Sequence, residues 1–191
     1  KPGVFELYSV SPFGGASIKL NAPLPEGGEV VVCTDDDRDS FFAVYLADQE
    51  ADGVFELFRV PIIGGPVQKV SGALVAGGDV SSDFRVRGGY VYYLADAEQD
   101  GRTELYRVSI DDPGPPTKLN GPLVAGGSVQ SFDLSINLVV YRADQLVDQT
   151  IELFSVPQAG GTPLHLNATL PSPGAVPVRE LAKMDPAVAA F

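Results

Sequence analysis

The sequence contains no tryptophan, and its 191 residues include only one histidine, one cysteine and one methionine. A single cysteine excludes a disulfide within the chain and any zinc site built from several cysteines. Basic residues are also scarce, because 13 lysines and arginines face 25 aspartates and glutamates, for a formal net charge of -12. Such a charge repels nucleic-acid phosphates and anionic lipids, and no apolar run approaches the ~20 residues that span a bilayer. We therefore expect neither nucleic-acid binding nor a membrane span.

Turn-forming residues are abundant. The chain has 21 glycines and 16 prolines, yet 45% of its residues are hydrophobic. This composition is typical of a folded domain with many short connections, or of several small repeats, and not of a disordered chain.

Four sequence markers recur along the chain in a constant order. A glutamate, a leucine and an aromatic residue follow one another at spacings of 50, 48 and 48 residues, beginning at Glu6, Glu56, Glu104 and Glu152. A second marker ends in Ala-Asp at Asp48, Asp96 and Asp144. A third begins at Lys19, Lys69, Lys118 and His165, and a glycine pair begins at Gly27, Gly77 and Gly126. The shared register indicates four copies of a unit of about 48 residues.

Each copy is expected to form four short strands separated by turn residues. In the middle complete copy these strands are predicted at 80–86, 90–96, 103–109 and 117–120. The second of them is apolar at nearly every position, which favours sheets covered on both faces. The sequence therefore predicts an all-β chain, a single β-propeller domain over residues 1–191 with four-stranded antiparallel blades.

The register also predicts how the two ends are used. Residues 3–6 match 53–56, so the chain begins at a third strand, and Phe191 follows Val176 at the distance that separates Tyr45 from Val30. We expect blades at approximately 29–71, 79–120 and 128–167, and a composite blade that joins 175–191 to 3–21. One chain closing into a four-bladed ring, exchange of ends between chains in a larger homo-oligomer, and a fragment of a longer propeller all fit this pattern.

The last segment has an alternative interpretation as a short helix. Val178, Leu181 and Ala182 lie at helical spacing, but Pro186 would interrupt such a helix.

The stretches 139–144 and 151–156, followed by the glycine pair at 160–161, resemble the WD40-like repeat of bacterial TolB-type propellers. The resemblance covers nearly the whole chain, although the expected blade number departs from that family and we expect no adjoining catalytic domain. It implies a non-enzymatic propeller with a periplasmic, cell-surface or secreted location. An accessory propeller of a larger exported hydrolase is the alternative that the resemblance leaves open.

Candidate catalytic residues are few. His165 occupies a position that is lysine in the other copies, so we expect it to be exposed on an outer strand. Cys33 occupies the position of Phe132, which predicts a small buried hydrophobic side chain. No hydrolase, zinc-peptidase or phosphate-loop motif is present, and we expect no enzyme activity.

Acidic loops are the most distinctive polar feature. The connections between second and third strands carry Asp48, Asp52, Asp96, Asp100, Asp144 and Asp148, all expected on one face. A further cluster on the opposite face contains Asp35, Asp37 and Asp39. These nine residues are the candidate metal ligands, because carboxylates suit calcium, while turn formation and attraction of a basic partner are alternatives.

Two further expectations concern side chains inside the repeat. The glutamates of the first marker lie within strands and need partners, for which Arg107 and Arg142 are candidates. A leucine in each connection should anchor it to the core: Leu24, Leu74, Leu123 and Leu170. The predicted function is a scaffold that presents its acidic loops to a protein partner, and a calcium- or small-ligand-binding domain is the alternative.

Overall fold

The computed structural model describes residues 4–34, 41–167 and 174–175. Over these ranges the chain forms strands, turns and loops and no helix. It follows that no helix in these ranges is long and apolar enough to cross a membrane.

The strands form three blades and a half blade. The half blade is the two-stranded sheet of β1 (Tyr8–Ser9) and β2 (Ile18–Lys19). The first blade contains β3 (Val30–Thr34), β4 (Phe42–Ala47), β5 (Glu56–Pro61) and β6 (Gln68–Lys69). The second contains β7 (Val80–Arg87), β8 (Tyr90–Ala95), β9 (Glu104–Ser109) and β10 (Thr117–Lys118). The third contains β11 (Val129–Leu134), β12 (Leu138–Ala143), β13 (Thr150–Pro157) and β14 (Leu164–His165), with β15 (Gly174–Ala175) against β13.

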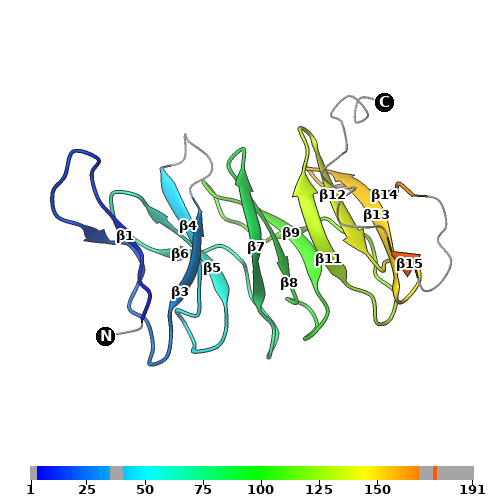
Figure 1. Cartoon of the computed structure of the whole chain (residues 1–191), viewed down its shortest axis with the longest axis horizontal. Helices are drawn as coiled ribbons and strands as arrows, with labels where there is room; N and C mark the ends of the chain where they lie inside the picture. The colour runs from blue at the N-terminus through cyan, green and yellow to red at the C-terminus, as the bar shows by residue number, and fades with distance from the viewer. Residues whose placement is uncertain (1–3, 35–40, 168–173, 176–191) are drawn as a thin grey trace.

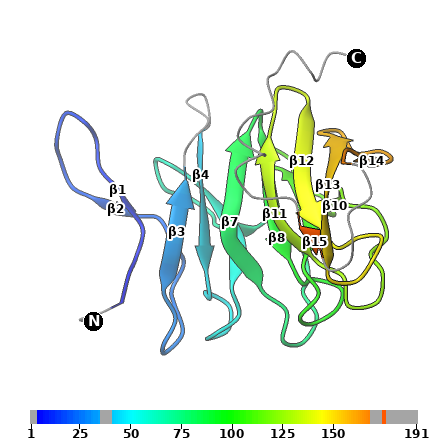
Figure 2. The same cartoon turned by 45° about the vertical axis from the view of Figure 1, so that its right-hand side comes forward.

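Within each blade, consecutive strands pair as antiparallel neighbours in the order predicted from the repeats. The strand-two tyrosine faces the strand-three aromatic residue in every blade, as Tyr93↔Tyr106 does in the second. The all-β prediction and its four-stranded blades are therefore confirmed. Figures 1 and 2 show the blades side by side in a row, with β3, β7 and β11 running in the same direction.

The hydrophobic core lies between the blades. Leu46 of the first blade packs in one cluster with Phe84 and Tyr93 of the second. The neighbouring residues Tyr92 and Leu94 of the same β8 strand belong to the next cluster, which they share with the third blade. Both faces of β8 are thus buried, and this explains why its sequence does not alternate between apolar and polar residues. Each large side chain buried in this way contributes about 1.5–3 kcal/mol.

A backbone hydrogen bond joins each blade to the preceding one. Val80 N donates to Phe55 O at 2.9 Å, and Val129 N donates to Thr103 O at 2.8 Å. The same link fastens the first blade to the half blade, where Val30 N donates to Phe5 O at 3.0 Å. The first strand of each blade therefore begins on the third strand of its predecessor.

The first strand of every blade contains a β-bulge just after this link. The pairing shifts between Val30 and Val32 in β3, and between Val129 and Ser131 in β11. Because of the extra residue, Val129 and Phe132 are both buried although they are three residues apart. An uninterrupted strand would point two such residues to opposite faces of the sheet.

The predicted composite blade is described only in part. Its N-terminal portion is the half blade, in which Tyr8↔Lys19 repeats the pairing of Phe58 with Lys69. Of its C-terminal portion only Gly174–Ala175 is described, so Phe191 and the positions of the alternative helix lie outside the described residues. The half blade and β15 lie at opposite ends of the row (Figure 1). The composite blade therefore remains a prediction.

One buried position was predicted wrongly. Cys33 pairs with Tyr45 in the same register as Phe132 with Tyr141, yet Cys33 is exposed, whereas Phe132 is buried. Phe132 is covered by Tyr92 and Leu94 in the second strand of the preceding blade. The half blade has no second strand among the described residues, which accounts for the exposure of Cys33.

The first prediction concerns this packing. Replacement of Leu105, which has no exposed surface, by alanine should lower the free energy of unfolding by about 2–5 kcal/mol because a cavity forms between two blades. The matched change Leu164→Ala, at a leucine that is 63% exposed, should alter it by less than about 0.5 kcal/mol. Urea unfolding followed by far-UV circular dichroism measures both values. Equal losses in the two variants would contradict the described core.

Candidate functional site

The connections between second and third strands lie along one edge of the row, which we call the loop edge. The antiparallel order places the β4–β5, β8–β9 and β12–β13 loops there, together with the turns that precede β3, β7 and β11 (Figure 1). The three loops between second and third strands carry eight carboxylates, which the register predicted on one face: Asp48, Glu50, Asp52, Asp96, Glu98, Asp100, Asp144 and Asp148.

The first aspartate of each loop holds backbone groups. Asp96 Oδ1 accepts from Asp79 N at 2.5 Å, and Oδ2 accepts from Gly101 N at 2.9 Å. Asp48 and Asp144 make the equivalent pairs of bonds in their own blades and are buried. Each carboxylate thus ties its loop to the start of its blade, which is the turn-forming role weighed from the sequence.

The second aspartate of each loop lies against a glycine turn. A Cβ atom added to Gly126, whose φ is +83°, would come within 2.7 Å of Asp148 Oδ1. Asp52 and Asp100 stand in the same relation to Gly27 and Gly77. The first glycine of each pair is therefore required both by its left-handed backbone and by the adjacent carboxylate.

Six of the nine candidate metal ligands lie within the described ranges. Asp35, Asp37 and Asp39 lie outside them. Within the described ranges, no three His, Cys, Asp or Glu side chains are grouped so that they could hold a metal ion. The calcium hypothesis is therefore a prediction that rests on the sequence alone.

The strand glutamates pair within their own blade, with the lysine of strand four. Lys69 Nζ lies 2.9 Å from Glu56 Oε1, and Lys118 Nζ lies 2.9 Å from Glu104 Oε2. Lys19 pairs with Glu6 in the half blade, and His165 Nε2 lies 3.1 Å from Glu152 Oε1 in the third blade. His165 is half-buried on the outer strand β14 and stacks on Phe154.

The two arginines predicted as partners of these glutamates have other surroundings. Arg107 stacks over the ring of Tyr90 at 4.5 Å and donates to Ala159 O in the third blade. Arg142 pairs across the sheet with Leu153, and its buried Nε has no hydrogen-bond partner in the described part of the chain. The prediction of an arginine partner was therefore wrong. The lysine or histidine of strand four is the diagonal neighbour of the glutamate on the same face of the sheet, and it is the partner instead.

The predicted leucine anchors are partly confirmed. Leu123 is 8% exposed and belongs to the cluster between the second and third blades. Leu74 is half-buried against the preceding cluster, and Leu24 is half-buried as well. Leu170 lies outside the described ranges.

A polar groove opens on the second blade beside its β8–β9 loop. It has a volume of about 430 Å³ and is lined by Glu98, Gln99, Arg102, Glu104, Lys118, Asn120 and Pro122. A smaller hollow of about 230 Å³ continues from Gln99 and Arg102 to the glycine turn at 125–128.

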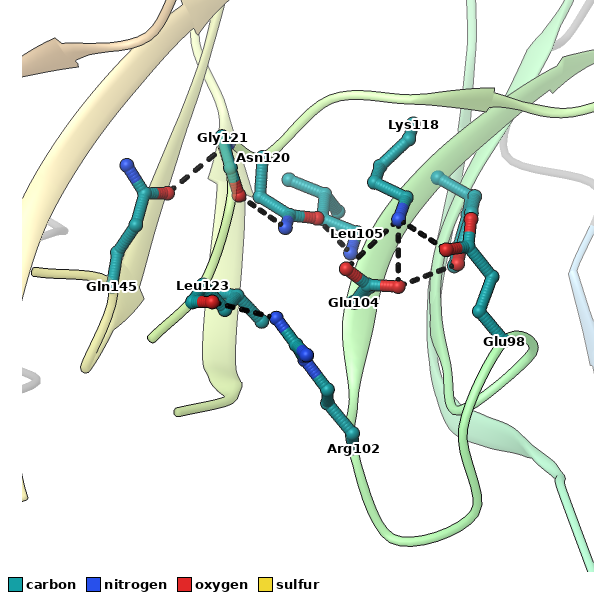
Figure 3. A network of polar contacts seen from close by, with 10 residues as sticks. Glu98, Arg102, Glu104, Leu105, Lys118, Asn120, Gly121, Leu123 and Gln145 are labelled. Atoms are coloured by element: carbon teal, nitrogen blue, oxygen red, sulfur yellow. Dashed lines mark hydrogen bonds and ion pairs between the residues drawn. The ribbon is translucent and has the colours of Figure 1, made fainter. Parts of the chain in front are cut away.

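The groove contains a chain of charged contacts. Lys118 Nζ lies 2.7 Å from Glu98 Oε2, and Arg102 Nη2 donates to Leu123 O at 2.8 Å (Figure 3). Burial alone would lower the pKa of Lys118, but its hydrogen bonds to Glu98 and Glu104 outweigh burial, and the net shift is upward. The ammonium group is thus held charged between two carboxylates, one of which, Glu98, is 60% exposed.

Arg102 is the lining residue that repeat analysis did not single out. Its position is Val54 in the first blade and Thr150 in the third. The available signal was that the sequence departs from the repeat at this position, two residues before the strand glutamate. Arg102 bonds across the junction to Leu123 O, so it fastens the second blade to the following connection.

The second prediction tests the glycine turns. Gly126→Ala should lower the melting temperature, because the new methyl group meets the Asp148 carboxylate and the backbone stays at positive φ. We expect a loss of about 1–3 kcal/mol from such a conformation. Gly114→Ala is the matched control, since a Cβ atom there meets nothing within 4 Å. Equal melting temperatures for the two variants would disprove the close approach.

The third prediction concerns alkaline pH. Burial raises the pKa of Tyr45 and of Tyr141 to about 12, and that of Lys118 is raised by its carboxylate partners despite its burial. The folded protein therefore keeps protons that the unfolded chain releases near pH ~10, so stability falls as the pH rises above that value. Melting temperatures between pH 8 and 11 should decrease steadily above about pH 10. A constant melting temperature would contradict these environments.

Comparison with known proteins gives no family assignment. No family model matches the chain, and no curated protein matches it. Among solved structures it is similar to the crystal structure of TolB from Acinetobacter baumannii, with 15% identity over 83% of this chain and 42% of that chain, at a TM-score of 0.39. The chain spans less than half the length of that protein. The blade architecture consequently rests on the strand pairing described above and not on this similarity.

Proposed function

We propose that this chain is a non-enzymatic interaction module whose loop edge presents an acidic surface to a basic protein partner. The observation that carries the proposal is that one carboxylate of each loop holds the backbone while the others face solvent. Asp48 and Asp144 are buried and Asp96 is half-buried, and each of the three holds its loop by two backbone bonds. The remaining acids face solvent, with Glu50 52% and Glu98 60% exposed.

This arrangement supports binding for two physical reasons. Loops that are already fixed lose little conformational freedom when a partner binds, so less of the interaction energy is lost. Carboxylates repeated at the same edge of successive blades add their potentials and attract a cationic partner over roughly one Debye length, about 8 Å at physiological salt. The groove beside Arg102 offers a concave surface within the same edge.

A non-catalytic role agrees with the surroundings of the single histidine. His165 lies against Glu152 and Phe154 on the outer strand β14 of the third blade and does not line the groove of the second blade. General acid–base catalysis most often uses a histidine within reach of a bound substrate.

The fourth prediction tests the acidic surface with a fluorescein-labelled lysine-rich peptide as the probe. The double variant Glu50→Gln/Glu98→Gln should weaken binding at least threefold at low salt, because it removes two exposed charges of the loop edge. The control is Asp111→Asn/Asp112→Asn, which removes two exposed charges in the β9–β10 loop at the opposite edge. Fluorescence anisotropy at 20 and 200 mM salt gives both affinities.

Equal weakening by the two double variants would show that only net charge matters and would contradict a specific surface. Absence of binding by the unaltered protein at 20 mM salt would contradict the proposal as a whole. Melting curves of both variants confirm that any loss does not come from unfolding.

A further inference from the structure

The loop between β12 and β13 has an apolar tip. Leu146 and Val147, which we call the apolar tip, are 50% and 49% exposed. The equivalent loops carry Glu50–Ala51 in the first blade and Glu98–Gln99 in the second, and all four residues are exposed. Each of those two blades is followed by a complete blade, so exposure at these positions is a property of the repeat. Adjacent apolar side chains that stay in water are typical of a surface that contacts a partner.

The apolar tip is carried by the same loop backbone as the tips of the other blades. Gln149 has a left-handed φ of +60°, where Gly53 and Gly101 have φ values of +74° and +73°. The turn bond from Thr150 N to Val147 O at 3.1 Å also recurs in the other two loops. The three loops therefore share one conformation and differ in the side chains that their tips present. A tip fixed in this way loses little conformational freedom when it binds.

Hydrogen bonds and close packing connect this loop to the groove of the second blade. Before the apolar tip, Gln145 Oε1 accepts from Gly121 N at 3.1 Å, and Asn120 Nδ2, from a residue that lines the groove, donates to Gly121 O at 2.9 Å (Figure 3). After the apolar tip, Asp148 lies against Gly126, which lines the smaller hollow. The loop that carries the apolar tip is thus fixed beside both the groove and the hollow.

The surroundings of the apolar tip carry an excess of negative charge. Four carboxylates stand against two cations around the groove, the hollow and the loop: Glu98, Asp100, Glu104 and Asp148 against Arg102 and Lys118. Lys118 is already paired with two of the carboxylates. The exposed acids therefore attract cations to the place where the apolar tip also lies.

We infer that the surface from the groove to the apolar tip binds a segment of a partner protein that combines basic residues with a large apolar residue. Such binding presupposes the proposed function and adds an apolar requirement to it. The basic residues meet Glu98, Asp100 and Asp148, and the apolar residue packs on Leu146 and Val147. An apolar contact surrounded by charged groups is the usual arrangement at the centre of a protein interface.

The fifth prediction compares two fluorescein-labelled peptides that contain the same number of lysines. One has serine spacers between the lysines, and the other has leucine spacers. The leucine peptide should bind the unaltered protein roughly fivefold more tightly or better, because part of a leucine leaves water. Fluorescence anisotropy at 20 and 200 mM salt gives the affinities. The advantage of the leucine peptide should persist at the higher salt, since salt screens charges and leaves apolar contacts in place.

Two variants locate the apolar contact. Leu146→Ser/Val147→Ser should remove the advantage of the leucine peptide and leave the affinity for the serine peptide unchanged. Leu146→Glu/Val147→Ala should also remove the advantage, and it gives the tip the residues that the first blade carries on the same loop backbone. The control is Ile136→Ser/Leu164→Ser, which replaces side chains of the same blade that are 62% and 63% exposed and lie outside this loop. The control should keep the advantage.

The outcomes separate the apolar requirement from the proposed function. Equal affinities of the unaltered protein for the two peptides would overturn the apolar requirement alone. An advantage that survives both tip variants, or that the control also removes, would overturn it as well. Absence of binding by either peptide at 20 mM salt would contradict the proposed function and the apolar requirement together. Melting curves of all variants show whether a loss comes from unfolding.

Discussion

The structure depends on the burial of both faces of each blade. A four-stranded sheet of this size has apolar side chains on two sides, as the successive residues Tyr92 and Tyr93 show by packing into different clusters. Neither face can be left in water without a large loss of hydrophobic stabilisation. Each blade is therefore stable only between neighbours, and the stability of the row is a sum over junctions.

Polar side chains hold strands three and four of each blade in register. The buried glutamate of strand three meets the lysine or histidine of strand four, and the asparagine or serine two residues later accepts from the adjacent leucine N–H. Leu105 N, for example, donates to Asn120 Oδ1 at 2.8 Å. The short outer strands have few ladder bonds, so these side-chain contacts supply what the backbone pairing lacks.

Much of this could be predicted from the sequence, because the markers recur in one register and each has a structural role. The strands of the second blade begin within one residue of their predicted starts. The partners of the strand glutamates were missed although the signal was present, since the first and third markers always occur together and face each other across strands three and four. The position of Cys33 could not be predicted from its own repeat, because its burial depends on whether the preceding blade is complete. Arg102 was missed for a related reason, as its contact reaches the connection that leads to the next blade.

The first strand of each blade and the connection after it determine where this chain can accept insertions and deletions during evolution. The distance from the linking valine to the strand-two tyrosine is 15, 13 and 12 residues in the three blades, yet the tyrosine meets the same aromatic partner each time. The one extra residue of the second blade lies in the bulge, because Phe84 follows Val80 by four residues where Phe132 follows Val129 by three. The three extra residues of the first blade lie between β3 and β4, because Tyr45 follows its partner Cys33 by 12 residues where Tyr141 follows Phe132 by nine. Insertions and deletions can therefore accumulate at these two places while strands two and three, and the surfaces that neighbouring blades share, keep the same pairing.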